Sequence, residues 1–260
     1  MKPIAEPNLY EAVNHAMTRR LQDGSAPTLM LFTNSGMVRA LDARYLKDGS
    51  TKDFNPKLVP AALSPRDSTS NANRFSGVDP RGLAPLRGGL YTSRHTSSMT
   101  AEILHYARNK PHVPIVGGFP DHDASMRELG VIQMRIVQPP LIVDLSRYAS
   151  ETAPFLAALE HDPDVRAALN HSRYKGAHLE RALFDGVDYS VARGIGNAVA
   201  NDSRFGGLRA GTARPSDREG ETGDNVVLYG PDYQPVSSVR AEKVTLFDPI
   251  TSNPITTKLD

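Results

Sequence analysis

One glutamate stands at a position where a charged side chain is unusual. The sequence predicts a helix that begins at the serine pair 97–98 and has Met99, Ile103 and Tyr106 on its core-facing side. Glu102 falls inside this apolar stripe, three residues from Met99 and four from Tyr106. Burying an unpaired carboxylate costs several kcal/mol. Such a carboxylate is either paired or serves a task, and Glu102 is therefore a candidate catalytic residue.

The common catalytic and binding motifs are mostly absent from the chain. It has no Gly-x-Ser-x-Gly elbow, no phosphate-binding loop with Gly-Lys-Ser/Thr and no His-Glu-x-x-His. Because the chain has no cysteine, disulfides, thiolate metal sites and cysteine nucleophiles are excluded. The Gly-Ile-Gly at 194–196 lacks the third glycine of a dinucleotide fingerprint, and the Asp-His-Asp at 121–123 fits a solvated turn better than a metal site. What remains is a set of polar residues near the ends of predicted strands, namely Arg74, Tyr91, Arg94, Thr212 and Arg214.

The elements that must position these residues can be read from hydrophobic periodicity. Helices are predicted over residues 8–21, over a stretch from 155 to 184 that is broken at Pro163 and Gly176, and over residues 189–200. Strands are predicted over residues 28–33 and 37–41, forming a hairpin, and over 90–93, 131–137, 141–145, 205–214, 225–229 and 239–247. Strands near both ends and helices in the middle indicate a single α+β domain with a mostly antiparallel central sheet.

Composition limits the kinds of partner. With 30 basic and 29 acidic residues interspersed, the chain lacks the charge pattern of a general nucleic-acid or membrane binder. No apolar run has the length of a membrane span, and the N-terminus lacks the features of a secretory signal. We therefore expect a soluble, cytoplasmic protein that binds neither nucleic acid nor membrane. A localised basic site for an anionic ligand stays open.

Two motifs in this chain resemble those of a known family. Residues 73–76 read Asn-Arg-Phe-Ser, and Tyr91 then opens a strand and is followed eleven residues later by Glu102. Residues 207–214 read Gly-Leu-Arg-Ala-Gly-Thr-Ala-Arg and precede the aliphatic strand at 225–229. In type, spacing and order these motifs resemble the RES-domain family, named for an arginine, a glutamate and a serine. The resemblance covers roughly residues 72–230.

The chain also departs from the family pattern. Thr212 stands where the family has serine, which keeps the hydroxyl but adds a methyl group. Phe75 replaces a tryptophan, and the insert between Arg74 and Tyr91 is longer than in the family. The alternative candidates for the family's arginine are Arg81, Arg87 and Arg94. Residues 1–70 have no counterpart, so we expect an N-terminal extension, helix plus hairpin, packed on a catalytic domain of residues 71–248, with a polar tail at 249–260.

The resemblance implies a fold similar to that of ADP-ribosyltransferases and a toxin that consumes NAD+, held in check by a cognate antitoxin or immunity protein. It implies catalytic roles for Glu102, Arg74 and Thr212, and NAD+ contacts from Arg74, Tyr91, Arg94, Thr212 and Arg214. The residue types suit these roles. A carboxylate stabilises an oxocarbenium-like transition state. A guanidinium binds diphosphate oxygens in pairs, an aromatic ring stacks on a base, and a hydroxyl holds ribose or carboxamide. No metal or second cofactor is expected.

The acceptor of the ADP-ribose stays open at this point. Water would make the protein an NAD+ glycohydrolase, phosphate an NAD+ phosphorylase, and a protein side chain a mono-ADP-ribosyltransferase. Two further readings are a non-enzymatic interaction module that keeps the fold without the site, and an RNA-cutting toxin, which the near-zero net charge disfavours. Whether the toxin acts in the bacterial cytoplasm where it is made or is delivered into another cell stays open as well.

Overall fold

The structure is a computed structural model of the 260-residue chain. It describes residues 8–51, 53–65, 75–77, 82–83, 85–95, 115–116, 119–120, 129–146, 149–184, 189–211, 224–247 and 255–259. In chain order, the elements among these residues are α1 (Leu9–Gln22), β1 (Thr28–Met30), β2 (Gly36–Asp42), η1 (Ala43–Leu46), η2 (Pro56–Leu58), α2 (Val59–Ala62), β3 (Gly88–Ser93), β4 (Ile115–Val116), β5 (Phe119–Pro120), β6 (Leu129–Ile136), β7 (Leu141–Leu145), α4 (Thr152–Glu160), α5 (Pro163–Asn170), α6 (Leu179–Phe184), α7 (Ser190–Asn201), β8 (Gly207–Gly211), β9 (Asp224–Gly230), β10 (Val239–Phe247) and β11 (Ile255–Lys258).

A nine-stranded sheet forms the centre of the molecule, in the order β1-β7-β8-β9-β3-β2-β6-β10-β11. The pair β7 and β8 is parallel, and the other neighbouring pairs in this sheet are antiparallel. Strands β4 and β5 form a separate small pair. The fold is therefore α+β with a mixed, mostly antiparallel sheet, as the sequence predicts. Among the described residues, no helix is both long and apolar enough to cross a membrane.

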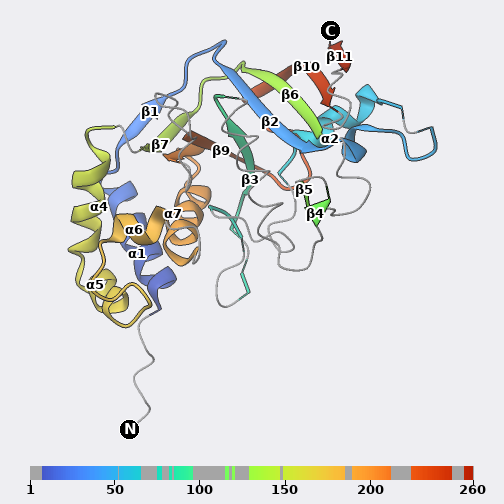
Figure 1. The fold of residues 1–260 in the computed structure, drawn as a ribbon. Helices are drawn as coiled ribbons and strands as arrows, with labels where there is room; N and C mark the ends of the chain where they lie inside the picture. Colours follow the sequence, from blue (N-terminus) through green and yellow to red (C-terminus); the bar gives the residue numbers. More distant parts are fainter. Residues whose placement is uncertain are drawn as a thin grey trace.

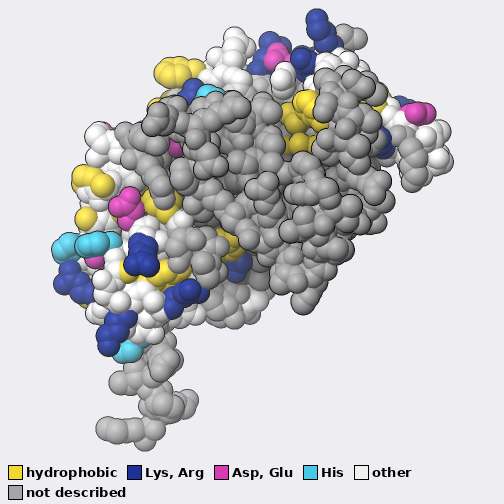
Figure 2. Space-filling view, in the orientation of Figure 1, with side chains coloured by type: hydrophobic (Ala, Val, Ile, Leu, Met, Phe, Trp, Pro, Cys, Tyr) yellow, Lys and Arg dark blue, Asp and Glu magenta, His cyan; other side chains and the backbone are white. Residues whose placement is uncertain are grey.

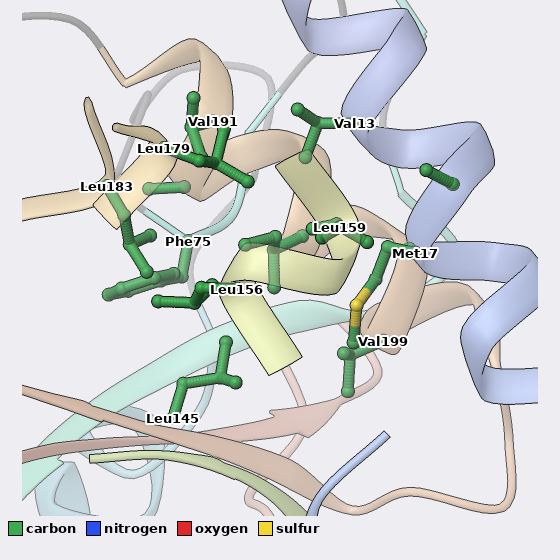
Figure 3. Packing of buried hydrophobic residues seen from close by; sticks show 14 of the residues in the cluster. Val13, Met17, Phe75, Leu145, Leu156, Leu159, Leu179, Leu183, Val191 and Val199 are labelled. Atoms are coloured by element: carbon green, nitrogen blue, oxygen red, sulfur yellow. The ribbon is translucent and has the colours of Figure 1, made fainter. Parts of the chain in front are cut away.

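Helices α1 and α4–α7 gather on one side of the sheet (Figure 1). Helix α1 begins at Asn8, whose side chain accepts a hydrogen bond from the Tyr10 amide at 3.0 Å. Its stripe of Val13 and Met17 is fully buried against the other helices (Figure 3). Helices α1 and α7 pack closely because α7 carries Gly194, where a Cβ atom would lie only 2.9 Å from the Tyr10 carbonyl oxygen. We call this helix-covered side of the sheet the helix face.

A second hydrophobic cluster lies on the opposite face of the sheet. It includes Leu90 of β3, Val226 and Leu228 of β9, and residues of β2, β6 and β10. Neighbouring residues in a strand point to opposite faces, so Leu90 joins this cluster while Tyr91 packs against the helix face. The short helix α2 contributes Val59 and Ala62 to the second cluster.

The N-terminal strands differ from the predicted hairpin. Strand β1 pairs with β7, and strand β2 pairs with β3 and β6, so the two do not pair with each other. Residues 1–70 therefore supply an edge strand and an interior strand to the same sheet that residues 71–248 build. At the other end, Ile255–Lys258 forms strand β11 on β10, where a polar tail was expected. The helix predicted to begin at the serine pair 97–98 lies outside the described residues.

Candidate active site

Several strands of the sheet end at one edge, and two of the predicted site residues lie on or directly after one of them, Tyr91 on β3 and Arg94 just beyond it. Because β9 runs antiparallel to both β3 and β8, the carboxyl ends of β3 and β8 meet the amino end of β9. Ser93 at the end of β3 lies opposite Asn225, and Gly211 at the end of β8 lies opposite Asp224. Strand β9 alone separates the two ends, which corresponds to about 10 Å. We call this the β3–β8 edge.

The predicted site residues fall into two groups. Tyr91 and Arg94 are described, whereas Glu102, Arg74, Thr212 and Arg214 lie outside the described residues. Arg94 follows directly on β3, is exposed, and forms no hydrogen bond or ion pair with another described residue. Along the chain, Thr212 follows the last residue of β8 and Arg74 precedes Phe75.

Tyr91 is partly buried on the helix face, and its hydroxyl is bound to the main chain. The Phe75 amide donates a hydrogen bond of 2.6 Å to the Tyr91 hydroxyl oxygen. On the neighbouring strand β2, Arg39 donates from Nη1 to the Tyr91 carbonyl oxygen at 3.4 Å. The predicted contact between the Tyr91 ring and NAD+ stays a prediction.

Hydroxyl groups fix the end of β3 against β9. The Ser93 hydroxyl donates to the Asp224 carbonyl oxygen at 3.1 Å and accepts from the His95 amide at 3.3 Å. One residue earlier, the Thr92 hydroxyl donates to the Val226 carbonyl oxygen at 2.7 Å. These bonds hold the strand in register up to Arg94 and set the point where the chain leaves the sheet.

A charged group that the sequence analysis missed lies at the same edge, on the face opposite the helices. Arg209 on β8 donates from Nε to Oδ2 of Asp224 at 2.9 Å, and its Nη1 lies 3.4 Å from Oδ2 of Asp144 on β7. Asp144 and Asp224 are 8% and 2% exposed, so both carboxylates are buried. Asp224 Oδ1 is buried too and has no hydrogen-bond partner among the described residues. The signal for this group was a charge inside each of two apolar strands, Leu-Ile-Val-Asp-Leu and Gly-Leu-Arg-Ala-Gly.

Arg87, one of the alternatives for the family's arginine, has a structural role. Its guanidinium donates to the carbonyl oxygens of Val199, Ala200 and Asp202, at 3.1, 2.8 and 2.6 Å, at the carboxyl end of α7. The same group lies 5.9 Å from the centre of the Tyr229 ring. Burial lowers the pKa of Arg87 below its ordinary value of 12.5, and the side chain nevertheless stays a cation at neutral pH. Because its N–H groups are bound to carbonyl oxygens at the end of α7, we do not assign Arg87 to a ligand.

A groove of about 400 Å³ lies elsewhere, between the end of α1, residues 25–27 and the start of α4. Its lining includes Arg20, Glu151 and Phe155, and none of the predicted site residues belongs to it. Over the helices on the face shown in Figure 2, basic, acidic and histidine side chains are interspersed rather than gathered by sign. Neither feature defines a second candidate site.

Comparisons with known proteins identify no relative of this chain: no protein-family model, no curated protein and no solved structure matches it. The part of the chain that the structure describes also contains no group of three or more His, Asp or Glu residues placed to hold a metal ion. The residues at the β3–β8 edge are therefore the basis for a functional proposal.

Proposed function

We propose that this protein cleaves the nicotinamide N-glycosidic bond of NAD+ and transfers the ADP-ribose to water or phosphate. It would then be an NAD+ glycohydrolase or NAD+ phosphorylase that inhibits growth by depleting NAD+, with a fold similar to that of ADP-ribosyltransferases. The alternative within the same chemistry is mono-ADP-ribosylation of a protein target. A non-enzymatic interaction module is the competing proposal outside it.

One observation carries the proposal. The two motifs that resemble the RES-domain family lie far apart in the chain. Strand β3 carries Tyr91 of the first motif, and β8 carries residues 207–211 of the second. These two strands flank the single strand β9. Both strands end at the same edge, so residues that follow them start from points about 10 Å apart. A nicotinamide ribose and the adjoining diphosphate span a comparable length. This arrangement supports a shared site made from both motifs.

The proposed reaction assigns the bond-breaking step to few groups. The bond between the ribose C1′ and the nicotinamide nitrogen breaks, and its electron pair stays on the nitrogen of the leaving nicotinamide. The Glu102 carboxylate stabilises the positive charge that develops on the ribose, and the Thr212 hydroxyl orients the ribose or the carboxamide. An oxygen of water or phosphate then bonds to C1′, and water releases its proton to solvent.

Binding is assigned to the cations and the tyrosine. Arg74 would bind diphosphate oxygens in pairs, supported by Arg94 and Arg214. Arg94 is the described member of this set, and its exposure at the end of β3 suits contact with an anion. The Tyr91 ring would stack on the nicotinamide or the adenine.

The proposal extends to where the protein acts. An NAD+-depleting enzyme would act in a bacterial cytoplasm, either in the producing cell or after delivery into another. A producing cell would need a cognate antitoxin or immunity protein. The substrate is NAD+, and the reaction as written requires no metal.

The test is to incubate the purified protein with NAD+, with and without phosphate, and to identify products by chromatography and mass spectrometry. We expect nicotinamide together with ADP-ribose, or with ADP-ribose 1″-phosphate when phosphate is the acceptor. Glu102→Gln should reduce turnover by at least about a hundredfold while leaving the thermal unfolding midpoint unchanged. The control is Glu242→Gln, which makes the same chemical change at an exposed residue of β10 that pairs with Arg135.

The outcomes separate the alternatives. Full turnover by Glu102→Gln would disprove the mechanism. Unchanged NAD+ with the wild-type protein, but transfer of labelled ADP-ribose to proteins in a cell extract, would favour the mono-ADP-ribosyltransferase. Unchanged NAD+ and no transfer would favour the interaction module.

A further inference from the structure

Two tyrosine hydroxyls from neighbouring strands bind the same residue. The Tyr91 hydroxyl of β3 accepts a hydrogen bond from the Phe75 amide at 2.6 Å, and the Tyr229 hydroxyl of β9 donates to the Phe75 carbonyl oxygen at 3.1 Å. The two hydrogen bonds thus hold both peptide groups of one residue. Burial raises the pKa of Tyr229 well above its ordinary value of 10.0, so its hydroxyl remains a donor at neutral pH.

Helix α7 holds the same segment from another side. Asn197 donates from Nδ2 to the Gly77 carbonyl oxygen at 2.9 Å, and this side chain is 1% exposed. Next to it, Gly196 approaches so closely that a Cβ atom would lie 2.0 Å from the Phe75 carbonyl oxygen. Residues 75–77 are therefore bound by side chains of β3, β9 and α7 at once.

The Phe75 side chain anchors the segment in the core. It is fully buried, and Figure 3 shows it between Leu156 and Leu183 of the helices and above Leu145 of the sheet. A buried ring alone leaves the main chain free to rotate about it. The two tyrosine hydroxyls remove this freedom because they bind the amide and the carbonyl of the same residue.

We propose that Tyr229 and the Tyr91 hydroxyl are positioning residues that fix the main chain at Phe75, the residue that follows Arg74 in the sequence, and so support the role assigned to Arg74 at the NAD+ diphosphate. This inference rests on the proposed function. It gives a role to Tyr229, which is not among the predicted site residues, and it gives the Tyr91 hydroxyl a role separate from that of its ring. The Tyr→Phe substitution separates the two roles, because it keeps the ring and removes the hydroxyl.

The experiment measures KM and kcat for NAD+ in Tyr229→Phe and Tyr91→Phe. Losing one of these hydrogen bonds should raise KM by about three- to tenfold and leave kcat within about twofold, because the bond to nicotinamide is broken by other groups. The matched control is Thr245→Val on β10, which removes the hydrogen bond between a buried hydroxyl and the Thr256 hydroxyl, away from the β3–β8 edge. It should leave KM unchanged.

Two further measurements test whether the tyrosine hydroxyls act through Arg74 and the main chain at Phe75. In an Arg74→Ala background, adding Tyr229→Phe should raise KM no further, because the residue that the hydroxyl positions is gone. Amide hydrogen exchange at Phe75 should accelerate in both tyrosine variants, while the amides of β9 keep their protection. A general loss of stability would instead accelerate exchange across the sheet.

The results distinguish this inference from the proposed function. If the wild-type protein turns over NAD+ and the tyrosine variants keep its KM, the positioning role is wrong and the proposed function stands. If Tyr229→Phe raises KM by the same factor with Arg74 present and in the Arg74→Ala background, this result also contradicts the positioning role. If the wild-type protein leaves NAD+ unchanged and fails to bind it, the proposed function fails and takes the positioning role with it.

Discussion

Arg209 on β8 and Asp224 on β9 form a buried ion pair whose Nε and Oδ2 atoms lie 2.9 Å apart. The same guanidinium reaches Asp144 on β7, so one cation serves two buried carboxylates on three adjacent strands. These strands end at the β3–β8 edge. The ion pair therefore ties together the places where β8 leaves the sheet and β9 enters it.

Removing this arginine should be costly. Arg209→Ala leaves two buried carboxylates without their cation, and we expect the free energy of unfolding to fall by about 3–5 kcal/mol. Urea denaturation at neutral pH measures the change. The control is Arg19→Ala, which breaks a 2.6 Å pair with Asp162 whose arginine is exposed, and there we expect at most about 1 kcal/mol. Equal losses in the two variants would contradict the structural account.

Gly196 tolerates no side chain, because a Cβ atom there would lie 2.0 Å from the Phe75 carbonyl oxygen. Gly196→Ala must push residues 75–77 away from α7, and we expect it to destabilise the protein by about 3 kcal/mol. Thermal unfolding measures the loss. Gly36→Ala on β2, where a Cβ atom would meet nothing within 4 Å, should change the midpoint little. If Gly196→Ala left the thermal unfolding midpoint unchanged, residues 75–77 would not pack against α7 as described.

Asp202 should contribute to stability at neutral pH and less in acid. The hydrogen bond from Arg204, opposed in part by burial, lowers the pKa of this carboxyl below its ordinary value of 3.8. A group with a lowered folded-state pKa stabilises the protein above its unfolded-state pKa, and this stability is lost as the pH falls through the folded-state value. Asp202→Asn should therefore reduce the drop in the urea midpoint between about pH 5 and pH 3. Parallel pH curves for the two proteins would refute this.

Tyr229 should make the free energy of unfolding depend on pH in the alkaline range. Burial and the neighbouring Tyr91 raise its folded-state pKa, so above about pH 10 the unfolded chain releases this proton before the native state does. The free energy of unfolding then falls as the pH rises through this range. Tyr229→Phe should make that fall shallower, whereas Tyr233→Phe, at a residue that is 71% exposed, should leave it unchanged. Equal slopes in all three proteins would contradict the raised pKa.

The sequence predicted elements well where the signal is local. Strands 141–145 and 239–247 have the predicted limits, and helix α1 differs from its prediction by one residue at each end. Pairing was harder, because it depends on contacts between distant residues. Asn-Ser-Gly at 34–36 is a turn sequence that favours a hairpin, but β1 pairs with β7 instead, and β2 enters the interior of the sheet.

The candidate site was predictable only in part for a similar reason. The sequence predicted a strand at 90–93 that contains Tyr91 and stops before Arg94, and β3 contains Tyr91 and ends at Ser93. Asp144 and Arg209 carried a local signal, a charge in an apolar strand, but their pairing requires knowing that β7, β8 and β9 are neighbours. The hydrogen bonds of Tyr91 and Tyr229 to Phe75 could not be predicted from the sequence pattern, because they involve the main-chain atoms of Phe75 and not its side chain.

The position of β9 in the sheet also bears on how the chain is made. Strand β9 lies between β3 and β8 but follows both in the sequence, so during synthesis neither can complete its pairing until residues 224–230 have left the ribosome. Sheets that depend on such distant pairings form slowly. A nascent chain that stops before residue 224 would expose two unpaired strand edges and lack a finished β3–β8 edge. Such a truncated chain would therefore lack the strand that joins β3 to β8, on which the proposed site depends.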